Sequence, residues 1–184
     1  MHKTVFDYDF RITQEDLKFE YQESLTNKLD LNLIDFDQNT LNEIVLWKVN
    51  RYAEFDSKLI SLINSINSTD FEIDIDKTKL ILRSLLNTNG VQLAMASTIL
   101  RFRNPSIYQI IDQRVFRIIY KNKELKLNTY LSEKNLNFQI ELYLQYLTDL
   151  KKVCTDLNIP FDNSDRILFM ADRRINKEHK LKNY

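Results

Sequence analysis

Residues 85–100 read LLNTNGVQLAMASTIL, and this stretch decides the fold because it places the chain's one glycine between two helical patterns. Apolar residues follow helical spacing on both sides of the polar break at 87–90, and Gly90 tolerates the positive φ that a tight turn needs. The pattern predicts one helix that ends near 86 and another that begins at Val91. The free N–H groups at that second start would attract a phosphate, although an ordinary helix hairpin with a glycine C-cap has the same pattern.

The composition favours helices throughout the chain. One glycine and two prolines in 184 residues is far below the usual share of about 7% and 5%, which argues against all-β folds and Gly-rich nucleotide loops. With 43% hydrophobic residues, the chain is long enough to bury a core and short enough for one domain. We therefore predict an all-α fold, a compact bundle of about eight helices in a single domain over 1–184.

Helical spacing of apolar residues locates the expected helices. They cover residues 14–29, 40–52, 57–66, 76–86, 91–103, 112–119, 134–157 and a last segment from 164. Residues able to cap these helix starts are Thr13, Asn39 or Thr40, Asp76, Asp112, and Asp162 or Ser164. Residues 71–76, FEIDID, alternate with period two, but no second strand of similar quality could pair with them, so we expect an extended connector.

Charge and cysteine usage exclude several classes of site. The chain has 26 basic and 26 acidic residues, yet eight basic and two acidic residues lie between 79 and 124, a local excess that also occurs as ordinary variation among surface helices. Cys154 is the only cysteine, which excludes an internal disulfide, a four-Cys zinc site and a four-Cys iron–sulfur cluster, and its apolar neighbours indicate packing. We expect no metal and no cofactor.

The sequence also bears on location. The N-terminal residues lack the apolar run of a signal peptide, and no stretch approaches 18 uncharged apolar residues, so no membrane span is expected. We expect a soluble, cytoplasmic protein.

Residues 80–120 resemble the helix-hairpin-helix segment of the DNA glycosylases that excise damaged bases. The family's hairpin reads Leu-Pro-Gly-Val-Gly, followed by small residues with an alanine, then by a short apolar segment and an aspartate. Here residues 89–92 fill the hairpin, Ala96 matches the alanine, and Asp112 follows it by 16 positions. The stretch IIDQRVFR at 110–117 is similar to the family's apolar-Asp-x-His/Arg-Val-x-Arg segment.

The resemblance implies a helix-hairpin-helix at 79–103 and an aspartate segment at 107–120. It implies a monofunctional glycosylase that hydrolyses the N-glycosidic bond of a modified base, with Asp112 as the catalytic carboxylate. Lyase chemistry through a lysine is not expected, because residues 93–95 are Leu, Ala and Met where bifunctional members carry the lysine. The partner is DNA, bound through its phosphates with little dependence on sequence. The expected DNA-binding residues are Asn89, Gly90, Val91, Gln92, Arg101, Arg103, Arg114 and Arg117.

Other interpretations remain open. A non-catalytic, glycosylase-like scaffold that binds DNA or a protein partner is favoured by Gln92, which replaces the second hairpin glycine, and by the short chain. In that case Asp112 only caps the helix that follows it. A function unrelated to nucleic acid is a third possibility. Five aromatic residues could stack on a flipped base, although helical spacing more often places such residues in a core: Trp47, Tyr52, Phe102, Tyr108 and Phe116.

Overall fold

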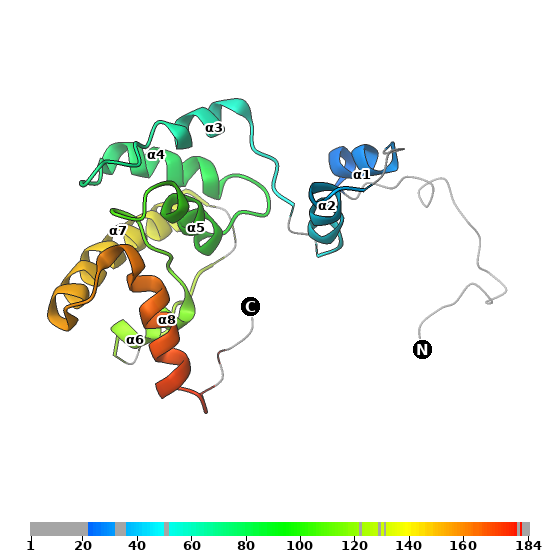
Figure 1. The fold of residues 1–184 in the computed structure, drawn as a ribbon. Helices are drawn as coiled ribbons and strands as arrows, with labels where there is room; N and C mark the ends of the chain where they lie inside the picture. The colour runs from blue at the N-terminus through cyan, green and yellow to red at the C-terminus, as the bar shows by residue number, and fades with distance from the viewer. Residues whose placement is uncertain are drawn as a thin grey trace. The chain divides into compact units, whose positions relative to one another are not determined.

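The computed structural model describes residues 22–31, 36–49, 52–121, 123–128, 130, 132–179 and 181. These residues form eight α-helices and one short 3₁₀ helix, with no strand among them, which confirms the all-α prediction (Figure 1). Where the sequence predicts one domain over 1–184, the structure groups the chain into two compact units, Met1–Tyr52 and Ala53–Tyr184. No helix in the described part of the chain combines the length and apolar character that a membrane crossing requires.

The described part of the first unit is a pair of helices, α1 (Glu23–Asp30) and α2 (Gln38–Lys48). They are joined by the Trp47 indole, which donates to the Thr26 hydroxyl at 2.9 Å. The cap of α2 is Asp37, whose carboxylate accepts from the Thr40 N–H at 2.7 Å, so the predicted caps Asn39 and Thr40 are wrong. Of the predicted helix 14–29, residues 14–21 and the expected cap Thr13 lie outside the described residues.

The second unit holds the larger core. Its helices are α3 (Ser57–Asn64), α4 (Ile75–Leu86), α5 (Leu93–Arg103), α6 (Gln113–Ile119), α7 (Glu133–Leu157), the 3₁₀ helix η1 (Phe161–Asn163) and α8 (Ser164–Ile175). α4 packs on α3, α5 and α7, and α6 packs on α8 (Figure 1). Fully buried side chains of α4, α5 and α7 fill the centre: Ile81, Leu82, Leu85, Leu93, Leu100, Tyr143 and Leu150.

Several helices of this unit begin at a capping side chain. Asp56, Asp74 and Ser132 each accept from the N–H three residues later, and so start α3, α4 and α7. The predicted start of α4 at Asp76 is therefore wrong, because Asp74 accepts from Lys77 N–H at 2.9 Å and brings the helix start forward.

The start of α8 also differs from the sequence prediction. Neither Asp162 nor Ser164 caps it, because residues 161–163 form the 3₁₀ turn and the Ser164 hydroxyl donates back to the Phe161 carbonyl at 2.8 Å. Asn163 occupies the N-cap position without a side-chain bond.

The turn between α4 and α5 contains Gly90 with a φ of 80°. Val91 is buried and its N–H donates to the Thr88 carbonyl at 3.1 Å, which anchors the turn. α5 begins at Leu93, two residues after the predicted start, with Gln92 at the N-cap position and no side-chain cap. Its end at Arg103, before Pro105, confirms the sequence prediction.

We expect Gly90→Val to lower the free energy of unfolding by about 1–2 kcal/mol, because a β-branched residue is strained at positive φ. Chemical denaturation of the two proteins measures the change. Asn89→Val is the matched control, since Asn89 is exposed in the same turn and is not among the residues with positive φ. Equal stability of the two variants would contradict the role given to Gly90.

Candidate functional site

Asp112 lies where an extended segment enters α6. Its carboxylate caps the helix by accepting from the Val115 N–H at 2.7 Å, which confirms the capping role predicted for it. The residue is half-buried and also lines a pocket of about 360 Å³, within the size range of small-molecule sites. The other lining residues are Ile110, Asp165, Arg166, Phe169 and Met170. Asp112 therefore combines a structural role with access to a pocket.

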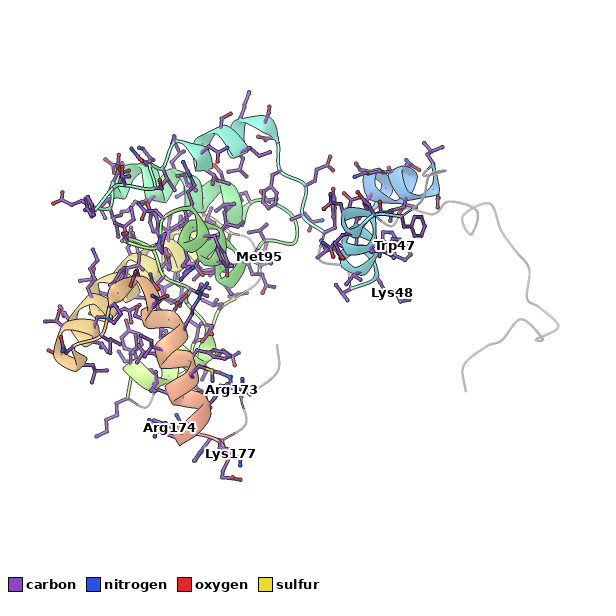
Figure 2. All side chains as sticks on the ribbon, in the orientation of Figure 1. Trp47, Lys48, Met95, Arg173, Arg174 and Lys177 are labelled. Carbon is purple, nitrogen blue, oxygen red and sulfur yellow. The ribbon has the colours of Figure 1, made fainter. Side chains whose placement is uncertain are left out.

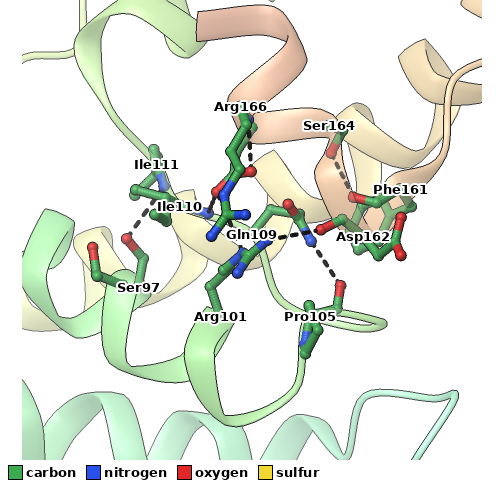
Figure 3. A network of polar contacts seen from close by, with 12 residues as sticks. Ser97, Arg101, Pro105, Gln109, Ile110, Ile111, Phe161, Asp162, Ser164 and Arg166 are labelled. Atoms are coloured by element: carbon green, nitrogen blue, oxygen red, sulfur yellow. Dashed lines mark hydrogen bonds and ion pairs between the residues drawn. The ribbon is translucent and has the colours of Figure 1, made fainter.

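The segment that leads into Asp112 is held by side chains from α5, α7 and α8. From α7, the Tyr143 hydroxyl donates to the Gln109 carbonyl at 3.0 Å, and the Tyr146 hydroxyl donates to the Ile110 carbonyl at 2.7 Å. From α5, the Ser97 hydroxyl accepts from the Ile111 N–H at 3.2 Å (Figure 3). These bonds satisfy backbone groups that have no helix or sheet partner, and so fix the approach to Asp112.

A second carboxylate, Asp165 of α8, lines the same pocket and is only 3% exposed. It accepts from the Ile110 N–H at 3.4 Å and lies 3.8 Å from the Arg101 Nε. The Arg101 side chain, 7% exposed, donates to the Asp162 carbonyl at 3.1 Å (Figure 3). Arg101 therefore lies inside the fold and links α5 to α8, and is not placed on the basic surface that the sequence predicts.

The surroundings of Asp112 raise the pKa of its carboxyl above the ordinary value. Burial is the main cause, and the negative charge of Asp165 adds to it, while the N–H groups of Val115 and Arg114 and the Arg114 charge act in the opposite direction. The hydrogen-bond donors of this carboxylate are backbone N–H groups of its own helix, which orient the group and offset part of the effect of burial on its pKa. Asp112 lines a pocket with mostly apolar walls, and in such surroundings a charge interacts strongly with a ligand.

Two further predicted arginines, Arg114 and Arg117 of α6, are paired with Asp172 of α8. The Arg117 Nε lies 2.6 Å and the Arg114 Nη1 lies 3.1 Å from carboxylate oxygens of Asp172, which is completely buried. Arg117 also donates to the His179 carbonyl at 2.9 Å. Arg103, on α5, donates to the Asn64 carbonyl at 2.9 Å. Each of the four predicted arginines thus has an internal partner, and they do not gather at one surface.

The Asp172 cluster has a defined electrostatic state. Burial alone would raise the pKa of Asp172, but hydrogen bonds from Arg117, Asn176 and Arg114 outweigh it, and the pKa is lowered. The pKa of Arg117 is raised, mainly by its hydrogen bond to Asp172. The cluster stays ionised at neutral pH and holds α6 against α8.

The predicted phosphate-binding hairpin has an exposed tip. Asn89, Gly90 and Gln92 are exposed, whereas Val91 is 5% exposed and its N–H already donates to Thr88. α5 lacks the side-chain cap that α4 and α6 have, so its first-turn N–H groups lack a side-chain acceptor. The tip can offer backbone donors from Gly90 and Gln92, but not from Val91.

The aromatic candidates are dispersed over the structure. Tyr108 is buried, and its hydroxyl shares a 2.6 Å hydrogen bond with Thr78, while Phe116 packs in the core against Tyr120. Phe102 is 66% exposed under the Arg101 guanidinium. Trp47 and Tyr52 belong to the first unit. None of these rings lines the Asp112 pocket.

Cys154 is buried in the core, as its apolar neighbours predict. Burial raises the pKa of its thiol, which disfavours the reactive thiolate. Within the described ranges, no three His, Cys, Asp or Glu side chains gather as metal ligands do.

Sequence reasoning missed the α8 side of the pocket, namely Asp165, Arg166, Phe169 and Met170. One signal was present in the sequence. Asp165 and Asp172 lie on the apolar side of the α8 pattern with Leu168, where an acid needs an internal partner. The signal predicts buried acids, but it does not identify the pocket.

Comparison of the chain with family models, curated proteins and solved structures finds no match.

Proposed function

We propose that this chain binds DNA and hydrolyses the N-glycosidic bond of a modified base, with Asp112 as the catalytic carboxylate. In this proposal α4, the Gly90 turn and α5 act as a helix-hairpin-helix. One observation carries it: the aspartate at the position of the glycosylase carboxylate lines a pocket with mostly apolar walls, at the end of a rigidly held segment. The resemblance of residues 80–120 to the glycosylases supplies the class of reaction.

The chemistry requires what Asp112 offers. Departure of the base breaks the bond between its ring nitrogen and C1′, and positive charge develops on the deoxyribose. A carboxylate fixed near C1′ stabilises that charge, and water then adds its oxygen to C1′ while a proton passes to the departing base. Ile110, Phe169 and Met170 would contact the flipped base through apolar surface, which also excludes water from the charge.

A second candidate function, a DNA-binding scaffold without catalysis, is favoured by the capping bond from Val115 to Asp112. This bond alone would account for an aspartate at that position. The two functions differ in whether the ionised carboxylate acts on a substrate.

The test is incubation of the purified chain with oligonucleotides that each carry one type of modified base, followed by alkaline cleavage at abasic sites. Catalysis predicts strand breaks at one or a few of these bases. The protein is used in excess over the oligonucleotides. If it binds them and none in the panel is cleaved, the catalytic function is contradicted and the scaffold is supported.

We expect DNA binding to depend on salt and hardly on sequence, because hairpin N–H groups and cationic side chains contact phosphates and not base edges. The logarithm of affinity should fall linearly with the logarithm of salt concentration, by about 0.7–0.9 per phosphate contact. A gel-shift titration with two oligonucleotides of unrelated sequence measures this. A peptide nucleic acid of matching sequence, which lacks phosphates, is the control, and equal binding to it would contradict the prediction.

A further inference from the structure

Helix α8 sorts its charges between its two faces. Its acidic residues Asp165 and Asp172 are 3% and 0% exposed and point into the fold. Its basic residues Arg166, Arg173 and Arg174 are exposed. Lys177 adds a further exposed positive charge just past the helix end, and Figure 2 labels it there together with Arg173 and Arg174.

The exposed residues form one row along the helix. Arg166, Met170 and Arg173 are spaced by four and three residues, and Arg174 is four residues from Met170, so they share a face. Lys177, in the turn just past the helix end, is also exposed. We call these five residues the α8 basic face. Successive turns carry it along the helix in steps of about 5.4 Å.

The α8 basic face begins at the candidate site. Arg166 and Met170 line the Asp112 pocket, and the remaining cations lie one or more turns further along. A ligand that reached into the pocket and continued outwards along α8 would therefore meet positive charge.

The cations of this face are available to a ligand. Arg166, Arg173, Arg174 and Lys177 form no ion pair with another described residue, whereas the nearby acid Asp172 is held by α6 arginines. Glu178 is an exposed acid just beyond the face and leaves an excess of positive charge there. Unpaired arginines are well suited to phosphate, which they bind with two parallel hydrogen bonds.

We propose that the α8 basic face binds the phosphate backbone of the nucleic-acid strand whose base enters the Asp112 pocket. The inference deepens the proposed function and rests on it for the identity of the strand. A lipid surface fits less well, because a membrane-binding helix must insert one continuous apolar side. Leu168 of α8 is buried in the protein, and the exposed apolar residues Ile167, Met170 and Ile175 are interspersed with arginines. Repeated phosphates along a strand match cations that are repeated along a helix.

The test compares two triple variants of the full chain by fluorescence anisotropy with an undamaged, labelled oligonucleotide at low salt. Arg173→Gln/Arg174→Gln/Lys177→Gln removes three cations from the face and leaves the pocket residues intact. Lys58→Gln/Lys126→Gln/Lys134→Gln removes the same charge from exposed positions on α3, the segment before α7, and α7. We expect the α8 variant to bind at least about tenfold more weakly. The slope of log affinity against log salt concentration should also become shallower by about 2–3, because three phosphate contacts are lost. The control variant should stay within about twofold of wild type, and both variants should keep the wild-type melting temperature.

Several results would overturn the inference. Unchanged affinity of the α8 variant would do so, and equal losses in both variants would show an effect of net charge alone. Failure of the wild-type chain to bind the oligonucleotide, together with α8-dependent binding to phosphatidylglycerol vesicles, would assign the face to lipid.

Binding to an undamaged oligonucleotide needs no chemistry, so the inference and the proposed function fail separately. Loss of binding in the α8 variant with no base release by wild type would support the α8 basic face and contradict catalysis. If wild type releases the base and the α8 variant binds DNA as well as wild type does, catalysis is supported and the role of the α8 basic face is contradicted.

Discussion

Asp112→Asn should abolish base release while the chain keeps its fold and its affinity for DNA. The asparagine carbonyl oxygen can still accept from the Val115 N–H, and asparagine caps helices as well as aspartate does. A neutral amide cannot stabilise positive charge at C1′, a loss that we place at about 10²–10³-fold or more in rate. Single-turnover cleavage assays on the modified base that wild type releases best measure it, and release at the wild-type rate would end the catalytic assignment.

The stability of this variant separates charge from capping. Because burial raises the pKa of Asp112, its ionised form is disfavoured in the folded chain. This cost is absent below the ordinary aspartate pKa of about 3.9 and is fully present above the raised, folded pKa. Asp112→Asn should therefore be at least as stable as wild type at pH 7, by thermal melting. Asp112→Ala, which loses the cap, should be about 1 kcal/mol less stable.

Asp172→Ala should lower the free energy of unfolding by about 3 kcal/mol, because it leaves Arg114 and Arg117 packed against α8 without their acid. Asp172 is completely buried, whereas Arg114 and Arg117 are partly exposed, so water can solvate the arginines in part. Urea denaturation followed by circular dichroism measures the change. Glu178→Ala removes an exposed acid from the same part of the chain and should change stability by less than about 0.5 kcal/mol.

The effect of Asp172 should depend on pH in a defined direction. Its pKa in the folded chain is lowered, so its contribution is fully present above the unfolded value of about 3.9 and is lost as the pH falls through the folded pKa. The stability difference between wild type and Asp172→Ala should hold from pH 7 to 5 and shrink in strong acid. A difference that vanished already at pH 5 would contradict the ionised cluster.

Much of the helical plan could be predicted because its signals are local. α7 has an apolar stripe over 25 residues, and α6 begins at the aspartate that the sequence marks as its cap. The sequence does not determine the start of α4, because Asp74 and Asp76 are both good caps and the choice between them depends on backbone direction. Helix boundaries set by competing polar residues are therefore less predictable than the helices themselves.

The candidate site was predictable only where its residues are close in sequence. Asp112 and the Gly90 turn were found, but Asp165 lies 53 positions beyond Asp112 and reaches the pocket only through tertiary packing. The local excess of basic residues predicts that Arg101 and Arg117 lie on a basic surface. In the structure both side chains instead pair with carboxylates of α8, Arg101 with Asp165 and Arg117 with Asp172. In the sequence, Tyr143 and Tyr146 of α7 resemble ordinary members of the helix's apolar side. Nothing in the sequence predicts that their hydroxyls donate to the backbone carbonyls of Gln109 and Ile110.

The backbone hydrogen bonds at 109–111 have a consequence for how remote substitutions reach Asp112. The donors and acceptors come from α5, α7 and α8, so we expect this segment to loosen only when those helices separate. We therefore expect the site to be either fully assembled or lost, with few intermediate arrangements. A destabilising change far from the pocket lowers the number of competent molecules and leaves each remaining one with the full geometry of Asp112.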